Sequence, residues 1–121
     1  AADPRWYGDG LRAEGWFGRV WLNPPYSRGL CSRFVGKLLG QYDAGNVTAA
    51  LLLVNASPSA RWFQAVLAEA HVCWLDKRVA FLDGGGNPVA GNPHAQACFY
   101  SGDDPQIFAA IWGRVGKVCA P

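Results

Sequence analysis

The feature that most constrains the fold is an uninterrupted apolar segment at residues 48–55, with the sequence TAALLLVN. A strand with one face in water alternates apolar and polar residues, and this segment does not alternate. We therefore expect a strand that is covered on both faces. A second run of strand-forming residues, 19–22, is stopped by two prolines and predicts another buried strand with an abrupt end.

Helical periodicity follows each of these two runs. A stripe that opens at Ser32 and ends near Gly45 predicts a helix between the strands, and a further stripe, which Ser57 or Ser59 can cap, predicts a second helix. The stripes consist of Phe34, Val35, Leu38, Leu39 and Tyr42 in the first helix, and of Trp62, Phe63, Val66, Leu67 and Ala70 in the second.

The rest of the chain is richer in strands. Short runs at 72–75 and 79–82 lead into a loop of Gly, Asn and Pro at 83–94, and a strand at 96–100 follows. Asp104 and Pro105 then start a helix that ends before Gly116. This order predicts an α/β fold whose sheet has parallel central strands and an antiparallel, strand-rich C-terminal section.

Composition favours one soluble domain. A chain of 121 residues, half of them apolar, can bury one core, so residues 1–121 are expected to form a single domain. No apolar run approaches the roughly 20 residues of a membrane span. The four cysteines are scattered without a CxxC pair or histidines at ligand spacing, which favours reduced thiols over a zinc site and predicts a cytoplasmic protein. His71 and His94 are interpreted as surface or loop residues.

Positive charge is concentrated in the first 40 residues, although the net charge is only +2. The residues concerned are Arg5, Arg12, Arg19, Arg28, Arg33 and Lys37, against Asp3, Asp9 and Glu14. Positive charge in the half of the chain that would hold a binding site suits a polyanionic substrate. The alternative is that these dispersed cations only keep the protein soluble.

The tetrapeptide Asn23-Pro24-Pro25-Tyr26 directly follows the first predicted strand. Ligands of open α/β sheets bind beyond the carboxyl ends of the strands, so these four residues are candidate site residues. Two prolines fix the backbone and leave carbonyls free to accept, while the Asn side chain adds an acceptor and the Tyr a flat stacking surface. Such a set suits a planar ring with an exocyclic amine. The alternative is a rigid turn, because Asn-Pro and Pro-Pro are common turn dipeptides.

Several ordered blocks extend this motif into a family resemblance. The segment from Asp9-Gly10-Leu11 through Gly18-Arg19-Val20-Trp21-Leu22 to Asn23-Pro24-Pro25-Tyr26 resembles the central part of phage-type, Dam-like DNA N6-adenine methyltransferases. Further blocks follow in the family's order: Leu52-Leu53-Val54-Asn55, Arg61-Trp62-Phe63-Gln64, Val72-Cys73-Trp74, Arg78-Val79-Ala80-Phe81 and Gln96-Ala97-Cys98-Phe99-Tyr100. The resemblance covers the chain from about Arg5 onward.

The resemblance implies transfer of a methyl group from S-adenosylmethionine to the N6 amine of adenine in DNA, on a partial Rossmann-like sheet. The catalytic residues would be Asn23, Pro24, Pro25 and Tyr26. The Asn23 side chain and the Pro24 carbonyl would accept hydrogen bonds from the amine, and Tyr26 would stack on a flipped base. The displacement would be direct and need no metal. Asp9 would lie near the adenine of the donor, or would simply precede a glycine turn.

The resemblance implies a first strand and a donor-binding loop before the Asp-Gly-Leu block, and we expect this chain to lack such a segment. The glycines at 84–86 do not replace it, because they lie in a late, hairpin-like connection. The alternative function is therefore a non-catalytic DNA-binding or base-binding module without the donor site. The strand near 19–23 would also lack a neighbour, and either residues 1–18 or a second chain, in a homodimer, is expected to cover that edge.

Overall fold

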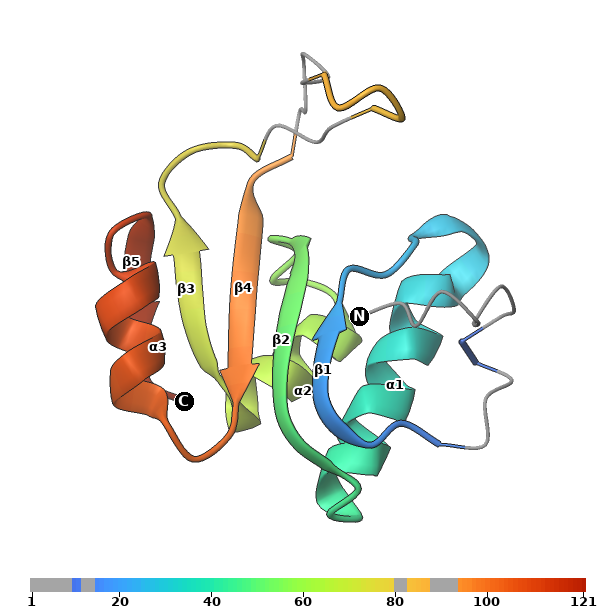
Figure 1. Ribbon diagram of the computed structural model, residues 1–121. Coiled ribbons are helices and arrows are strands. Elements are labelled where there is room, and N and C mark those ends of the chain that lie inside the picture. Colours follow the sequence, from blue (N-terminus) through green and yellow to red (C-terminus); the bar gives the residue numbers. More distant parts are fainter. Residues whose placement is uncertain (1–9, 12–14, 80–82, 88–93) are drawn as a thin grey trace.

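A mixed sheet with the strand order β1-β2-β4-β3-β5 organises the protein (Figure 1). The computed structural model describes residues 10–11, 15–79, 83–87 and 94–121. Within them, the elements in chain order are β1 (Gly18–Leu22), a 3₁₀ helix η1 (Ser27–Gly29), α1 (Leu30–Asp43), β2 (Val47–Asn55), α2 (Arg61–Glu69), β3 (His71–Leu75), β4 (Gln96–Ser101), α3 (Pro105–Trp112) and β5 (Gly116–Cys119).

β1 and β2 are hydrogen-bonded neighbours in the sheet. The two strands are parallel, Leu22 lies opposite Leu52, and α1 connects them. The expectation of parallel central strands is wrong, however. In the described residues β1–β2 is the one parallel pair, and it lies at one side of the sheet. The reason is that β4 enters between β2 and β3 and runs antiparallel to both. The predicted antiparallel C-terminal section is confirmed.

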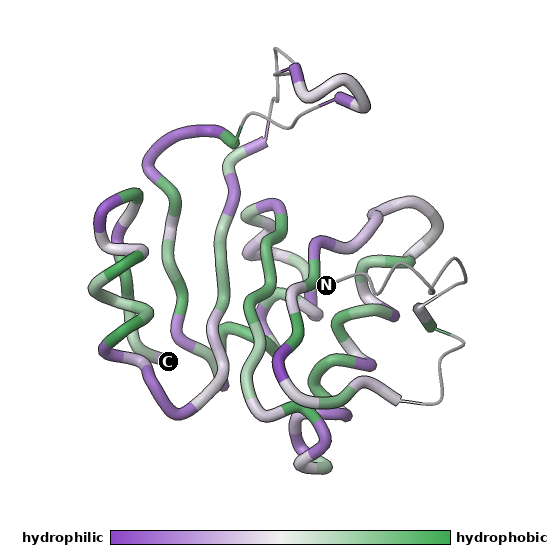
Figure 2. The backbone as a smooth tube through the Cα atoms, in the orientation of Figure 1, coloured by the Kyte–Doolittle hydropathy of each residue, from purple (hydrophilic) through white to green (hydrophobic). Residues whose placement is uncertain are grey.

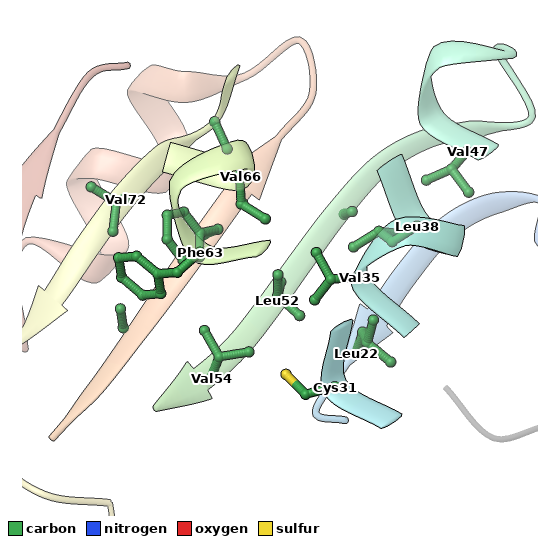
Figure 3. Close-up of a cluster of buried hydrophobic side chains, with 14 residues drawn as sticks. Leu22, Cys31, Val35, Leu38, Val47, Leu52, Val54, Phe63, Val66 and Val72 are labelled. Carbon is green, nitrogen blue, oxygen red and sulfur yellow. The ribbon is translucent and has the colours of Figure 1, made fainter. Parts of the chain in front are cut away.

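Helices cover the two faces of the sheet unequally. On one face α1 and α2 enclose the larger core, in which Phe63, Leu52 and Val35 are fully buried (Figure 3). On the other face α3 packs over a smaller cluster that contains Leu53, Cys98 and Phe108. The strands β2 and β4 lie between these layers, and both are mostly hydrophobic along their length (Figure 2). This burial on both faces explains the apolar sequence of residues 48–55.

The predicted helices are present, with corrections at the starts of the first two. The first helix begins at Leu30 rather than Ser32 and ends before Gly45, whose φ of 81° favours glycine. Ser57 and Ser59 do not cap α2: its N-cap is Ala60, and no side chain bonds to that cap. A turn, in which the Ala60 amide donates to the Ser57 carbonyl, starts the helix instead. Pro105 begins α3 as predicted.

The sequence did not predict β5, which pairs with β3. Its first residue, Gly116, interrupts the apolar pattern, yet glycine is required there because a Cβ would collide with the Trp74 carbonyl. The predicted strand at 79–82 is not found at Val79, and residues 80–82 lie outside the described part of the chain. No helix of the described residues is long and apolar enough to cross a membrane.

Candidate functional site

The four residues Asn23 to Tyr26 leave the sheet at the carboxyl end of β1. Because β1 and β2 are parallel, the end of β2 at Asn55 lies at the same edge of the sheet. The structure thus brings the predicted motif beside a second strand end. The location agrees with the rule that ligands of α/β sheets bind beyond the carboxyl ends of the strands.

Buried and exposed residues are interleaved in the motif. Pro24 is buried, whereas Asn23 and Pro25 are exposed. The Asn23 side chain makes no hydrogen bond with any residue in the described ranges, so its amide oxygen and nitrogen are open to a ligand. Since a buried proline fixes the backbone directly after Asn23, the amide is presented from a rigid position.

Tyr26 is fixed by β2. Its hydroxyl oxygen accepts a hydrogen bond from the Asn55 backbone amide at 2.7 Å, and its side chain remains 40% exposed. Burial raises the pKa of the Tyr26 phenol, while the bond from Asn55 acts in the opposite direction and the neighbouring Cys31 adds a small increase. The phenol is therefore neutral at pH 7, with an exposed ring and a hydroxyl proton that is still available to donate.

Two polar residues connected to the motif were not predicted from the sequence as candidate site residues. Asn55 and Gln96 pair across β2 and β4, and the Gln96 amide nitrogen donates to the Asn55 side-chain oxygen at 2.6 Å. Asn55 ends an apolar strand just as Asn23 follows one, and this repeated position was a usable signal. Gln96 gave no such signal, because only the tertiary structure buries it.

The predicted donor residue Asp9 lies outside the described residues. Its neighbour Gly10 lies against α1, where the Gly10 carbonyl accepts from Lys37 at 2.7 Å and from the Trp16 indole at 3.2 Å. The Lys37 ammonium also lies 4.9 Å from the centre of the Trp16 ring. Of the six cations in the first 40 residues, Lys37 therefore has a structural role. Of the others, Arg19 and Arg33 are exposed.

The glycines at 84–86 form a self-contained turn. The Asp83 carboxylate accepts from the amides of Gly85 and Asn87, both at 2.9 Å, and the Asp83 amide donates to the Asn87 carbonyl at 2.8 Å. These two amides are therefore already bonded to a carboxylate of the chain itself. This supports the interpretation that the turn does not act as a donor-binding loop.

An open hollow of about 600 Å³ lies on the α3 face of the sheet, over β1 and β2. Its lining includes Trp21, Leu51 and Ile107, together with Arg19 on β1 and Asp103 before α3. None of the four residues from Asn23 to Tyr26 lines it.

The four cysteines are unpaired thiols, and Cys31, Cys73 and Cys98 are buried. Burial raises the pKa of Cys31 to about 11 and that of Cys98 to about 12, so both are protonated and unreactive at neutral pH. Within the described ranges, no group of three His, Cys, Asp or Glu side chains could hold a metal ion.

Comparison with known proteins gives one result. The family model described as DNA N-6-adenine-methyltransferase (Dam) matches residues 8–107, which include β1, the Asn23–Tyr26 motif and every strand up to β4. No curated protein and no solved structure matches the chain.

Proposed function

The chain belongs to the DNA N-6-adenine-methyltransferase (Dam) family, and we propose that it binds adenine of DNA at the Asn23–Tyr26 motif for methylation at N6. The observation that carries this proposal is the exposed Asn23 side-chain amide, which has no hydrogen-bond partner among the described residues. The buried Pro24 follows it directly, and the Tyr26 ring of the same motif is held by a hydrogen bond to β2. An acceptor and a stacking surface side by side suit a flipped adenine, whose N6 group donates and whose ring stacks.

The residues activate the amine by hydrogen bonding. The Asn23 side-chain oxygen and the Pro24 carbonyl accept from the two N6 hydrogens, which draws the nitrogen lone pair out of conjugation with the ring and directs it away from the ring plane. Tyr26 fixes the ring plane by stacking. Orientation and preorganised acceptors supply the catalysis, since two consecutive prolines fix the backbone that presents them.

S-adenosylmethionine, which Dam-family methyltransferases generally use, would supply the electrophilic methyl group. The glycine turn at 84–86 does not offer it a cradle, because the amides of Gly85 and Asn87 are taken by Asp83. The described contacts of Asn23 and Tyr26 support the adenine half of the site. An adenine half without an identified donor loop favours, as a second candidate, a module that binds the base or DNA without transferring methyl.

The sheet supports a relation to the Rossmann-like methyltransferase fold. Its pairings give β1, β2 and β3 one direction and β4 the opposite one, so β4 is an antiparallel strand inserted between parallel-running neighbours. We propose that residues 18–119 form the motif-bearing part of such a sheet.

Two measurements separate the candidates. Calorimetry with S-adenosylmethionine, and transfer of labelled methyl to adenine-containing DNA, should both be positive for an enzyme, with N6-methylated DNA as the unreactive control. The transfer assay is run with this chain alone and with any upstream segment of its gene supplied in trans. Binding of adenine-containing DNA without donor binding or transfer would identify the module. If neither DNA nor donor binds, the adenine-site proposal is wrong.

A further inference from the structure

Gln96 is a buried polar residue whose hydrogen bonding is incomplete. Only 3% of its surface is exposed, its amide nitrogen donates to Asn55, and its side-chain oxygen has no hydrogen-bond partner among the described residues. A buried acceptor without a partner destabilises a folded protein and is rare in native structures. The next three residues of β4, Ala97, Cys98 and Phe99, are apolar and buried, as expected of a central strand.

Stability does not explain a glutamine at this position. An apolar side chain of similar size, such as methionine, would fill the same space without an unsatisfied oxygen. Local departures from good packing chemistry concentrate at functional sites, where a residue is retained for what it positions.

Gln96 is connected to the candidate site by consecutive contacts. It lies opposite Asn55 in the β2–β4 ladder, and the ladder continues through the Ala56 amide and the Ala95 carbonyl at 2.8 Å. The side-chain bond from Gln96 to Asn55 adds a second restraint on the end of β2. The Asn55 backbone amide then donates to the Tyr26 hydroxyl. The position of Tyr26 therefore depends on where β4 holds the last residue of β2.

We propose that Gln96 is a positioning residue of the adenine site: through Asn55 it holds the end of β2 so that the Asn55 amide fixes the Tyr26 ring. The inference rests on the proposed function for the role of Tyr26, but the hydrogen-bonded connection can be tested without any ligand. Gln96 acts through Asn55, and its side chain takes no part in the reaction.

The experiment compares Gln96→Met, Tyr26→Phe and the double variant, with Gln106→Met as the matched control, because Gln106 is exposed on α3. Hydrogen exchange of the Asn55 amide, followed by NMR, reports the bond to Tyr26 directly. We expect faster exchange in Gln96→Met and in Tyr26→Phe, no change in the control, and a melting temperature for Gln96→Met that is unchanged or higher. Should Gln96→Met not fold, Asn55→Ala breaks the same connection from its other side and should speed exchange at residue 55.

Binding of an adenine-containing single-stranded oligonucleotide supplies the second readout. Gln96→Met should raise the Kd several-fold. The double variant should bind no more weakly than whichever single variant binds more weakly, because both changes release the same ring. Unchanged exchange at Asn55 in Gln96→Met would overturn the inference, and so would additive losses of binding. If exchange rises but the wild type itself binds no adenine, the connection stands and the proposed function fails.

Discussion

At the scale of single residues, the site combines one free amide with one restrained ring. Asn23 has no partner among the described residues, whereas the Tyr26 hydroxyl is bonded to the end of β2. The difference separates their roles, because a free acceptor can bond to a ligand at once, while a restrained aromatic ring loses little entropy on stacking. Each residue therefore gives a distinct prediction.

Replacement of Asn23 by alanine should abolish methyl transfer and leave the fold intact. The side chain is exposed and unbonded, so the unfolding free energy should change by no more than about 0.5 kcal/mol, as for ordinary surface substitutions. Labelled-methyl transfer to DNA and thermal melting measure the two effects. Gln106→Ala, which removes an exposed amide from α3, is the control and should retain activity. Wild-type activity in Asn23→Ala would refute its assignment as the acceptor.

Tyr26 should separate stacking from hydrogen bonding. Tyr26→Ala removes the ring and should weaken adenine binding by about 1–3 kcal/mol, the usual contribution of an aromatic stack on a base. Tyr26→Phe keeps the ring but leaves the Asn55 amide without its acceptor, which should lower the unfolding free energy by about 0.5–1.5 kcal/mol and weaken binding less than Tyr26→Ala does. Titration of an adenine oligonucleotide and urea denaturation provide the values. Equal binding by the alanine variant and the wild type would exclude stacking on Tyr26.

At the scale of elements, α2 packs against the central strands with a fully buried aromatic residue, Phe63. Phe63 is fully buried, and its ring lies 5.1 Å from that of Phe99 and 5.7 Å from that of Trp74. The contact connects α2 to β4 and β3, so it holds in place the strand that carries Gln96. Packing in this layer thus affects the site from a distance.

Phe63→Ala should therefore lower the unfolding free energy by about 3–5 kcal/mol, the usual cost of removing a buried aromatic ring. Phe17→Ala is the matched control, because Phe17 is 71% exposed, and its change should stay within about 0.5 kcal/mol. Urea denaturation followed by tryptophan fluorescence gives both numbers. Similar losses in the two variants would contradict the assignment of Phe63 to the core.

At the scale of the whole molecule, β1 is an edge strand beside a poorly covered face. It pairs with β2 alone among the described strands, and the hollow on the α3 face exposes Trp21. The hollow is lined by Arg19 from β1 and by Asp103 and Asp104 from the segment before α3. Charges of both signs on one surface suit a self-complementary contact. The described residues before β1 include Gly10 and Trp16, which lie against α1.

We expect β1 to be covered in solution, either by residues 1–18 or by a second copy of the chain, because an open strand edge favours association. If a second copy covers it, light scattering should give a dimer mass, and Trp21→Glu should give a monomer. Val115→Glu is the control, since Val115 is also exposed but does not line the hollow. If residues 1–18 cover the edge, the protein should be monomeric with slow exchange of the β1 amides. A monomer with rapid exchange throughout β1 would contradict both.

The sequence alone determined the helices, most of the strands and the position of the Asn23–Tyr26 motif, because these depend on local patterns. An apolar run without alternation specifies a strand buried on both faces, and two prolines stop a strand wherever it lies. Tertiary structure decided the rest. Hydrophobic periodicity does not encode which strands become neighbours, so the insertion of β4 beside β2, and with it the burial of Gln96 and the bond from Asn55 to Tyr26, depended on long-range packing. The glycine-interrupted β5 was missed for the same reason, because only its contact with Trp74 requires glycine at position 116.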